Sequence, residues 1–267
     1  MDPTVPLMDP SDAPGHRSEP VLETTGLSKT FRGFTAVDAV DLAVAEGDVH
    51  ALVGPNGAGK TTLFNLLTGF LKPSAGQIML GGRDITGSSP ERIARLGVAR
   101  SFQITNLFEQ LTLQEHVELA LLGTTKLGHK FWVSDRVLTR FRVRAGELLD
   151  QVGLARHRNV PAGTLAYGQK RALELALALA LDPTLLLLDE PTAGMGMEDV
   201  ERTVELVRRI RTDRTVVLVE HNMSVVAGLA DRVTVLQFGR ILTEGTYDEV
   251  RNNPMVIEAY LGGESAA

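Results

Sequence analysis

The sequence contains no cysteine in its 267 residues. That absence excludes a disulfide-stabilised scaffold, a zinc or iron–sulfur site with cysteine ligands, and a catalytic thiol. Long apolar runs are missing as well. The longest candidate extends only from Leu175 to Leu181 and has a charged residue at each end, Glu174 and Asp182. A membrane-spanning helix needs roughly 18–20 apolar residues, so we expect no segment to cross a bilayer. The N-terminus also lacks the hydrophobic core of a secretory signal.

The chain has no excess of basic residues. Lys and Arg together number 27 against 33 Asp and Glu, for a formal charge of −6. Proteins that bind nucleic acid usually carry a basic excess, so we expect no nucleic-acid partner. With 43% hydrophobic residues, the chain can bury the core of one large α/β domain or two small ones. We expect a soluble, cytosolic, globular protein.

The two ends differ in composition from the rest of the chain. The first 20 residues hold five of the twelve prolines and few large apolar residues. Such a segment cannot offset the entropy that it would lose on ordering. We therefore predict a flexible tail at 1–20, a folded domain at 21–263 and a flexible C-terminus at 264–267.

Apolar patterning predicts the main elements of that domain. Leu63, Leu66, Leu67 and Phe70 recur at the spacing of one helix face. Short apolar runs predict strands at 48–53, 185–188, 215–219 and 233–237, and a hairpin arm at 77–80. Strands that alternate with helices are typical of an α/β fold whose mostly parallel sheet is covered by helices.

Residues 104–164 have helical periodicity and few β-branched runs, so we predict an inserted helical subdomain there. The segment carries a basic cluster made of Arg136, Arg140, Arg142 and Arg144. We interpret it as a solvated helix face, with a contact to a partner or to lipid headgroups as the alternative.

A glycine-rich loop follows the predicted strand at 48–53 and fits the pattern G-x-x-x-x-G-K-[ST] at every fixed position. Its glycines let backbone N–H groups approach phosphate oxygens, and the following helix directs its positive end at them. Lys60 supplies a charge for the β- and γ-phosphates, and the Thr61 hydroxyl can ligate Mg²⁺. The sequence thus predicts a nucleoside triphosphate site formed by Gly54, Pro55, Asn56, Gly57, Ala58, Gly59, Lys60, Thr61 and Thr62.

Two adjacent acids end the predicted strand at 185–188. Asp189 is placed to hold Mg²⁺, and Glu190 to polarise a water for in-line attack on the γ-phosphate. The alternative is structural: the acids could cap a following helix that starts at Pro191. Behind a phosphate loop we favour the catalytic interpretation.

With these motifs in place, residues 21–263 resemble the ATP-binding subunits of ABC transporters. The segment from Leu165 to Gln169 is similar to the family signature LSGGQ and precedes a helix predicted at 170–181. The resemblance implies a P-loop, RecA-like core with an antiparallel β subdomain and a helical subdomain. It also implies that Ala166, Gly168 and Gln169 close over the ATP held by a second subunit.

The resemblance assigns three more residues to the ATP site. Gln103 corresponds to the Q-loop glutamine that contacts Mg²⁺ or water, and His221 to the switch histidine at the γ-phosphate. Phe31 corresponds to the aromatic that stacks on adenine, with Phe34 as the competing choice. We expect the other histidines to be structural or solvated: His16, His50, His116, His129 and His157.

Two positions depart from the family pattern. Ala166 replaces the signature serine, which removes a hydrogen bond to phosphate worth roughly 1.5–3 kcal/mol. Gly196 stands where the family usually has the aspartate of its D-loop. Both changes affect a site completed across the dimer, so a different partner chain could supply the better signature. Equal hydrolysis at both sites of a heterodimer would count against this asymmetry.

Within the family, the segments 65–70, 190–195 and 253–262 resemble the Liv-type ATPases of branched-chain amino acid importers, with urea and other amide importers as relatives. The resemblance implies a peripheral subunit at the cytoplasmic face of the inner membrane. Its partners would be a second ABC ATPase, identical or different, and transmembrane permease subunits. An extracytoplasmic solute-binding protein would act indirectly.

Two other classes remain as alternatives. One is a soluble ABC ATPase without a transport role, although translation factors carry two cassettes in one chain and repair ATPases carry long coiled coils. The other is a P-loop kinase of small molecules, which has no use for a glycine signature loop. We expect an energy-coupling ATPase with ATP and Mg²⁺ as its ligands.

Overall fold

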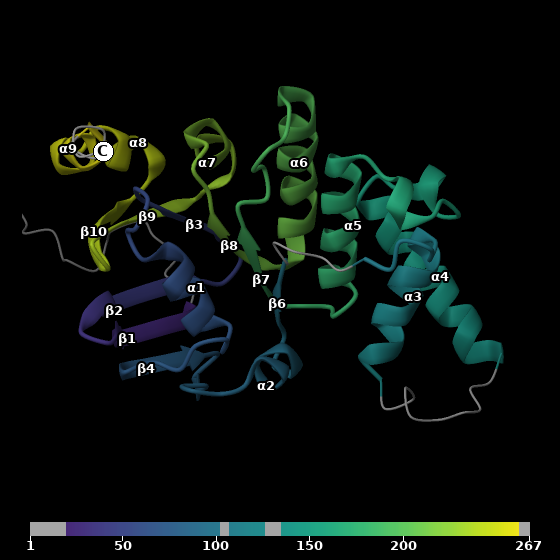
Figure 1. Cartoon of the computed structure of the whole chain (residues 1–267), viewed down its shortest axis with the longest axis horizontal. Coiled ribbons are helices and arrows are strands. Elements are labelled where there is room, and N and C mark those ends of the chain that lie inside the picture. Colours follow the sequence, from purple (N-terminus) through teal and green to yellow (C-terminus); the bar gives the residue numbers. More distant parts are fainter. Residues whose placement is uncertain (1–19, 102–106, 126–134, 262–267) are drawn as a thin grey trace, which may run out of the picture.

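The computed structural model describes residues 20–101, 107–125 and 135–261 (Figure 1). Residues 1–19 of the tail predicted at 1–20 and the whole C-terminus predicted at 264–267 lie outside them, while Pro20 begins the first strand. The predicted domain limits stay predictions. The strands are β1 (Pro20–Phe31), β2 (Phe34–Ala45), β3 (Val49–Val53), β4 (Ala75–Leu80), β5 (Arg83–Asp84), β6 (Val98–Arg100), β7 (Leu185–Asp189), β8 (Thr215–Val219), β9 (Arg232–Gln237) and β10 (Arg240–Gly245). The α-helices are α1 (Lys60–Leu67), α2 (Pro90–Arg95), α3 (Leu113–Gly123), α4 (Asp135–Gln151), α5 (Tyr167–Leu179), α6 (Met197–Ile210), α7 (Met223–Leu229), α8 (Tyr247–Arg251) and α9 (Pro254–Leu261).

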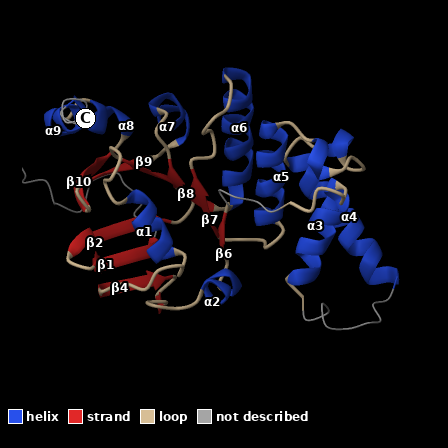
Figure 2. Ribbon diagram, viewed as in Figure 1, coloured by secondary structure: helices blue, strands red, loops and turns tan. Residues whose placement is uncertain are grey.

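The strands of the described ranges form two sheets (Figure 2). The larger has the order β10-β9-β3-β8-β7-β6, and its strands are parallel except for the edge strand β10. The smaller is antiparallel, with the order β2-β1-β4-β5. This arrangement confirms the predicted α/β class with an antiparallel β subdomain.

The central strands β7 and β8 of the larger sheet are buried on both faces, which explains their largely apolar sequences. In β7, Leu185 and Leu187 pack into the core around α1, while Leu186 and Leu188 pack on the opposite face with α5 and α6. The core around α1 also takes side chains from β1, β2 and β4. Helix α1 thus lies between the two sheets, with its N-terminus at the edge where β3 ends.

Helix α1 buries Leu63, Leu66 and Leu67 as the spacing predicts, but the prediction for Phe70 was wrong. The helix ends at Leu67, and Gly69 has a φ of +75° that turns the chain away. An added Cβ at Gly69 would lie 2.5 Å from the Ser88 carbonyl oxygen, so the turn also needs glycine for space. Phe70 is consequently left exposed.

Between β6 and β7 the described chain is helical. Helix α3 begins at a capping box in which the Thr112 hydroxyl accepts from the Glu115 N–H and the Glu115 carboxylate accepts from the Thr112 N–H. Helix α5 packs on the face of the sheet that α6 also covers, and α3 and α4 pack against α5 at the right of Figure 1. Arg140 and Arg142 of the basic cluster are exposed on α4, which agrees with a solvated face.

Helix α5 starts at Tyr167, three residues earlier than predicted. Tyr167, Gly168 and Gln169 therefore form the first helical turn instead of a preceding loop. The side-chain carbonyl of Gln169 accepts from the Ala166 N–H (3.1 Å), and this local contact extends the helix to its N-cap.

None of the helices in the described part of the chain is long and apolar enough to cross a membrane.

Candidate active site

The predicted site residues follow three neighbouring parallel strands. β3 runs into the glycine loop, β7 ends at Asp189 before Glu190, and β8 is followed by Glu220 and His221. Because β8 lies between β3 and β7 in the sheet, these residues gather at one edge, where α/β folds bind ligands.

The glycine loop fits its neighbours too tightly for side chains at two positions. An added Cβ at Gly54 would lie 2.2 Å from the Leu236 carbonyl oxygen, and one at Gly59 would lie 2.4 Å from that of Ala36. Both residues also have positive φ, +148° and +101°. Strands β9 and β2 thus hold the loop from outside, and the loop leads into the N-terminus of α1, a favourable position for an anion.

Lys60 begins α1 and folds back over this loop. Its ammonium donates to the carbonyl oxygens of Gly54 (2.6 Å) and Pro55 (3.0 Å). Burial lowers the pKa of Lys60, and the negative charges of Glu190 and Asp189 oppose that shift. Among the other loop residues, Ala58 is buried, while Asn56, Gly57 and Thr61 are exposed and Thr62 is half-buried.

Asp189 is paired with a residue that we did not predict. The Arg100 guanidinium at the end of β6 lies 2.7 Å from Asp189 Oδ2 and 2.6 Å from Asn65 Oδ1. The same guanidinium stacks over the rings of Phe64 and Phe70, at 5.4 and 5.7 Å from their centroids. A basic residue that ends a strand just before Gln103 was the only signal in the sequence for this contact.

The second oxygen of Asp189 matters for a metal. The side chain of Asp189 is only 1% exposed. Its Oδ1 is buried and has no hydrogen-bond partner within the described residues. A buried carboxylate oxygen without a donor is a fitting ligand for Mg²⁺, which prefers oxygen. The site therefore fits the predicted metal.

Glu190 and His221 meet across the ends of β7 and β8. His221 Nε2 lies 2.6 Å from Glu190 Oε1, and both side chains are partly exposed. The Glu190 N–H donates to the Val219 carbonyl (2.9 Å), although its backbone adopts a φ of +48°. The alternative in which a helix starts at Pro191 was wrong, since the next helix, α6, starts at Met197.

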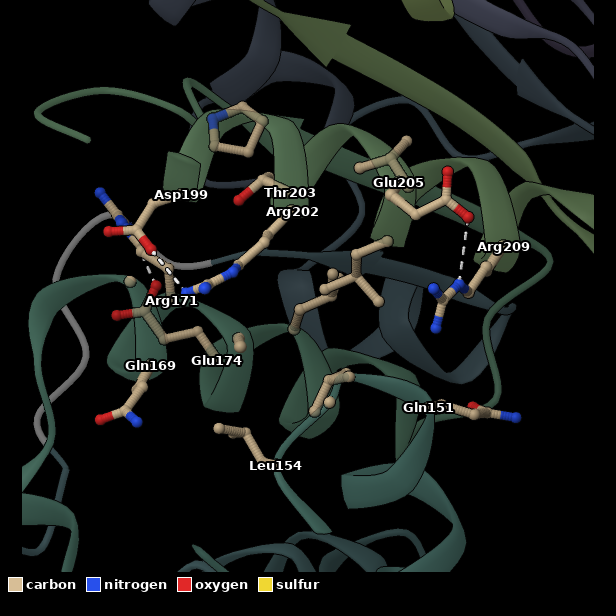
Figure 3. A pocket seen from close by; sticks show the side chains of 18 of the residues that line it. Gln151, Leu154, Gln169, Arg171, Glu174, Asp199, Arg202, Thr203, Glu205 and Arg209 are labelled. Atoms are coloured by element: carbon tan, nitrogen blue, oxygen red, sulfur yellow. Dashed lines mark hydrogen bonds and ion pairs between the residues drawn. The ribbon is translucent and has the colours of Figure 1, made fainter. Parts of the chain in front are cut away.

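The segment that resembles the family signature is exposed at Ala166 and Tyr167. Its glycine, Gly168, faces α6: an added Cβ would lie 3.0 Å from Asp199 Cγ. Figure 3 shows Gln169, Arg171 and Glu174 of α5 opposite Asp199, Arg202 and Thr203 of α6, across a cleft of about 610 Å³. Within it, Arg171 forms an ion pair with Glu174 at 2.8 Å. The missing side chain at Gly168 thus leaves room for the Asp199 carboxylate.

Two predicted residues remain to be placed. Phe31 and Phe34 flank the turn between β1 and β2, and both are exposed. The Lys29 ammonium lies over the Phe31 ring, 5.1 Å from its centroid. Because both rings are exposed, the choice of the ring that stacks on adenine stays open. Gln103 lies outside the described residues.

Comparison with known proteins decides the family. The model of the family described as "ABC transporter" matches residues 37–193. The chain belongs to the ABC transporter family. A second model, for the branched-chain amino acid ATP-binding cassette transporter, matches residues 240–266.

Named relatives of this family match nearly end to end. The high-affinity branched-chain amino acid transport ATP-binding proteins LivG of Salmonella typhimurium and BraF of Pseudomonas aeruginosa are each 41% identical to this chain. Both alignments cover 92% of this chain and 99% of the relative. Among solved structures, the ADP conformation of MJ1267, an ATP-binding cassette of an ABC transporter, has a TM-score of 0.82 at 29% identity. It covers 92% of this chain and 100% of that one.

These matches confirm the predicted ABC ATPase fold and identify the chain as an ATP-binding, ATP-hydrolysing subunit of an ABC transporter. The phosphate loop, Asp189, Glu190 and His221 are therefore described below as parts of an ABC ATPase site.

Proposed function

We propose that this chain is the ATPase subunit of an importer for branched-chain amino acids, at the cytoplasmic face of the cell membrane. The observation that carries the proposal is the 41% identity to LivG and BraF over almost their whole length. The match of residues 240–266 to a branched-chain amino acid cassette family adds to it. This C-terminal segment lies outside the general ABC match at 37–193, so it supports the substrate class independently.

In the proposed reaction, the loop from Gly54 to Thr62 binds the phosphates of ATP and Lys60 binds the β- and γ-phosphates. Its contacts with carbonyl oxygens keep the ammonium inside the loop, so little reorganisation is needed to reach a phosphate. Phe31, or else Phe34, stacks on adenine. Gln103 keeps its assigned contact with Mg²⁺ or water.

Glu190 orients the attacking water and takes its proton as the water oxygen bonds to the γ-phosphorus and the bond to ADP breaks. The 2.6 Å contact with His221 fixes the Glu190 carboxylate, and leaves its second oxygen for the water. Mg²⁺, when bound, neutralises charge on the phosphate oxygens. Thr61 and Asp189 Oδ1 would hold it.

We further propose that two such subunits enclose ATP between them beneath the permease subunits. A related cassette, MJ0796, has been solved as a dimer in a post-hydrolysis state bound to ADP and Pi, with a TM-score of 0.72 at 26% identity. The exposure of Ala166 and Tyr167 at the start of α5 supports a contact with phosphate from a second subunit. Because Ala166 lacks a hydroxyl, a different partner chain with a complete signature is the better fit.

Uptake of radiolabelled leucine tests the substrate class. A strain from which this chain has been deleted should lose uptake, regain it with the wild-type chain and fail to regain it with Glu190→Gln. Urea uptake in the same strains is the control. Unchanged leucine uptake in the deletion strain would refute the proposed substrate, and loss of urea uptake alone would point to an amide importer.

Purified variants test the site. Glu190→Gln should retain ATP affinity and lose more than about 100-fold in kcat, because the amide cannot take the proton. Lys60→Ala should lose ATP binding itself. Glu205→Gln, an exposed acid on α6 paired with Arg209, serves as the matched control. Normal hydrolysis by either site variant would contradict the assignment.

A further inference from the structure

The carboxylate of Glu220 is buried between the two loops that follow β7 and β8, and the residue is 3% exposed. One oxygen, Oε1, accepts from the Thr192 N–H (3.1 Å) and the Thr192 hydroxyl (2.5 Å). The other, Oε2, accepts from the backbone N–H groups of His221 (3.0 Å) and Asn222 (3.2 Å). Each oxygen therefore holds a different loop.

Glu220 takes part in none of the ion pairs within the described ranges. Its charge is instead stabilised by the four donors, which is the condition under which a buried carboxylate is tolerated. The carboxylate is the acceptor in all four contacts. Each of its oxygens faces two donors, and at least one donor on each side is a backbone N–H whose position is fixed. An amide could satisfy one side only, so the arrangement requires a carboxylate and not merely a polar side chain of this size.

The two loops carry the reacting groups. Glu190 lies two residues before Thr192, and His221 directly follows Glu220. The contact between His221 Nε2 and Glu190 Oε1 closes a ring that runs through both loops and the Glu220 carboxylate. Glu190 also has the left-handed φ of +48°, a conformation that persists only where surrounding contacts hold it.

We propose that Glu220 is a positioning residue for ATP hydrolysis. By fastening Thr192 to the backbone of His221 and Asn222, it sets the distance between the Glu190 carboxylate and the His221 imidazole. This inference rests on the proposed roles of Glu190 and His221 in the site. Among the described residues, the hydrogen bonds of the Glu220 carboxylate go to Thr192, His221 and Asn222 and none goes to the nucleotide loop or to the Glu190 side chain, so its effect passes through the two loops.

The variant Glu220→Gln keeps the shape of the side chain and replaces one acceptor oxygen with a donor. It should lower kcat roughly 10- to 100-fold, the effect expected when a reacting group shifts by a fraction of an ångström to 1 Å. The KM and the dissociation constant for ATP should change by less than about threefold, because the phosphate loop is untouched.

Thr192 offers a second, milder test of the same contact. Thr192→Val removes the hydroxyl and should lower kcat, whereas Thr192→Ser keeps it and should stay within about threefold of the wild type. In the double variant Thr192→Val/Glu220→Gln, the loss should be smaller than the product of the two single losses, because both changes break the same contact.

A matched control lies elsewhere in the fold. Glu244 on β10 also accepts from a threonine hydroxyl, that of Thr234 (2.8 Å), and pairs with Arg232. Glu244→Gln should lower the melting temperature without a change in kcat. Comparison with Glu220→Gln then separates loss of stability from loss of catalytic geometry.

Three outcomes would overturn the proposal: wild-type kcat in Glu220→Gln, a loss of kcat matched by an equal loss of ATP affinity, or multiplicative losses in the double variant. Glu190→Gln and His221→Ala are measured alongside. If both of these keep full activity, the proposed site itself is wrong. If they lose activity while Glu220→Gln keeps it, only the positioning role fails.

Discussion

Removal of Arg100 should destabilise the protein strongly through Asp189. The ion pair between Arg100 and Asp189 is largely buried, since their side chains are 13% and 1% exposed. The Arg100 guanidinium lies 2.7 Å from Asp189 Oδ2. Arg100→Met leaves a buried carboxylate whose Oδ2 loses its cation and whose Oδ1 has no donor within the described residues. Removing one partner of such a pair costs roughly 3–5 kcal/mol. At about 2–4 °C per kcal/mol for a domain of this size, the melting temperature should fall by on the order of 10 °C.

The assay is thermal unfolding of the nucleotide-free protein, followed by circular dichroism. Asp189→Asn in the Arg100→Met background removes the uncompensated charge and should recover more than half of the loss. Arg209→Met, which breaks an exposed pair with Glu205, is the matched control and should cost less than about 1 kcal/mol. The reasoning is wrong if Arg100→Met has the same melting temperature as Arg209→Met. It is also wrong if adding Asp189→Asn to Arg100→Met does not raise the melting temperature.

Two further predictions concern stability. Burial lowers the pKa of His50 to about 4, so the unfolded chain binds a proton more readily below pH 6.5, and the free energy of unfolding should fall by about 3 kcal/mol between pH 6.5 and 4. Urea titrations should show this loss in the wild type and not in His50→Leu; equal pH profiles would refute it. Gly54→Ala should lower the melting temperature more than Gly57→Ala, since its Cβ would lie 2.2 Å from the Leu236 carbonyl oxygen while that of Gly57 meets open space. Gly57→Ala carries only the strain of a positive φ, roughly 1–2 kcal/mol, and equal losses would contradict the close packing at Gly54.

Much of the fold and of the site was predictable because the signals are local. Strand β7 contains the apolar run Leu185–Leu188 and β8 the run Val216–Val219, and such runs mark strands buried on both faces. The phosphate loop follows β3, Glu190 follows β7 directly, and His221 lies two residues after the end of β8. Since parallel strands end at a common edge, their meeting there follows from the order of the strands along the chain.

The misplaced details have local causes that apolar spacing does not register. Phe70 fits the helix spacing, but Gly69 ends the helix before it by a turn that depends on the neighbouring Ser88 carbonyl. Helix α5 starts early because the Gln169 side chain caps its own N-terminus. In both cases a side-chain or backbone contact sets the end of the helix, and hydrophobic periodicity does not report such contacts.

The class of fold, the phosphate loop and the acids at the strand ends could be predicted from local patterns, because each depends on residues adjacent in the chain. The groups that hold them in place became visible in the folded structure alone. Arg100 reaches Asp189 across 89 positions and Glu220 reaches Thr192 across 28. Such contacts arise from the order and spacing of strands in the sheet, and their energies depend on burial, which no local pattern specifies.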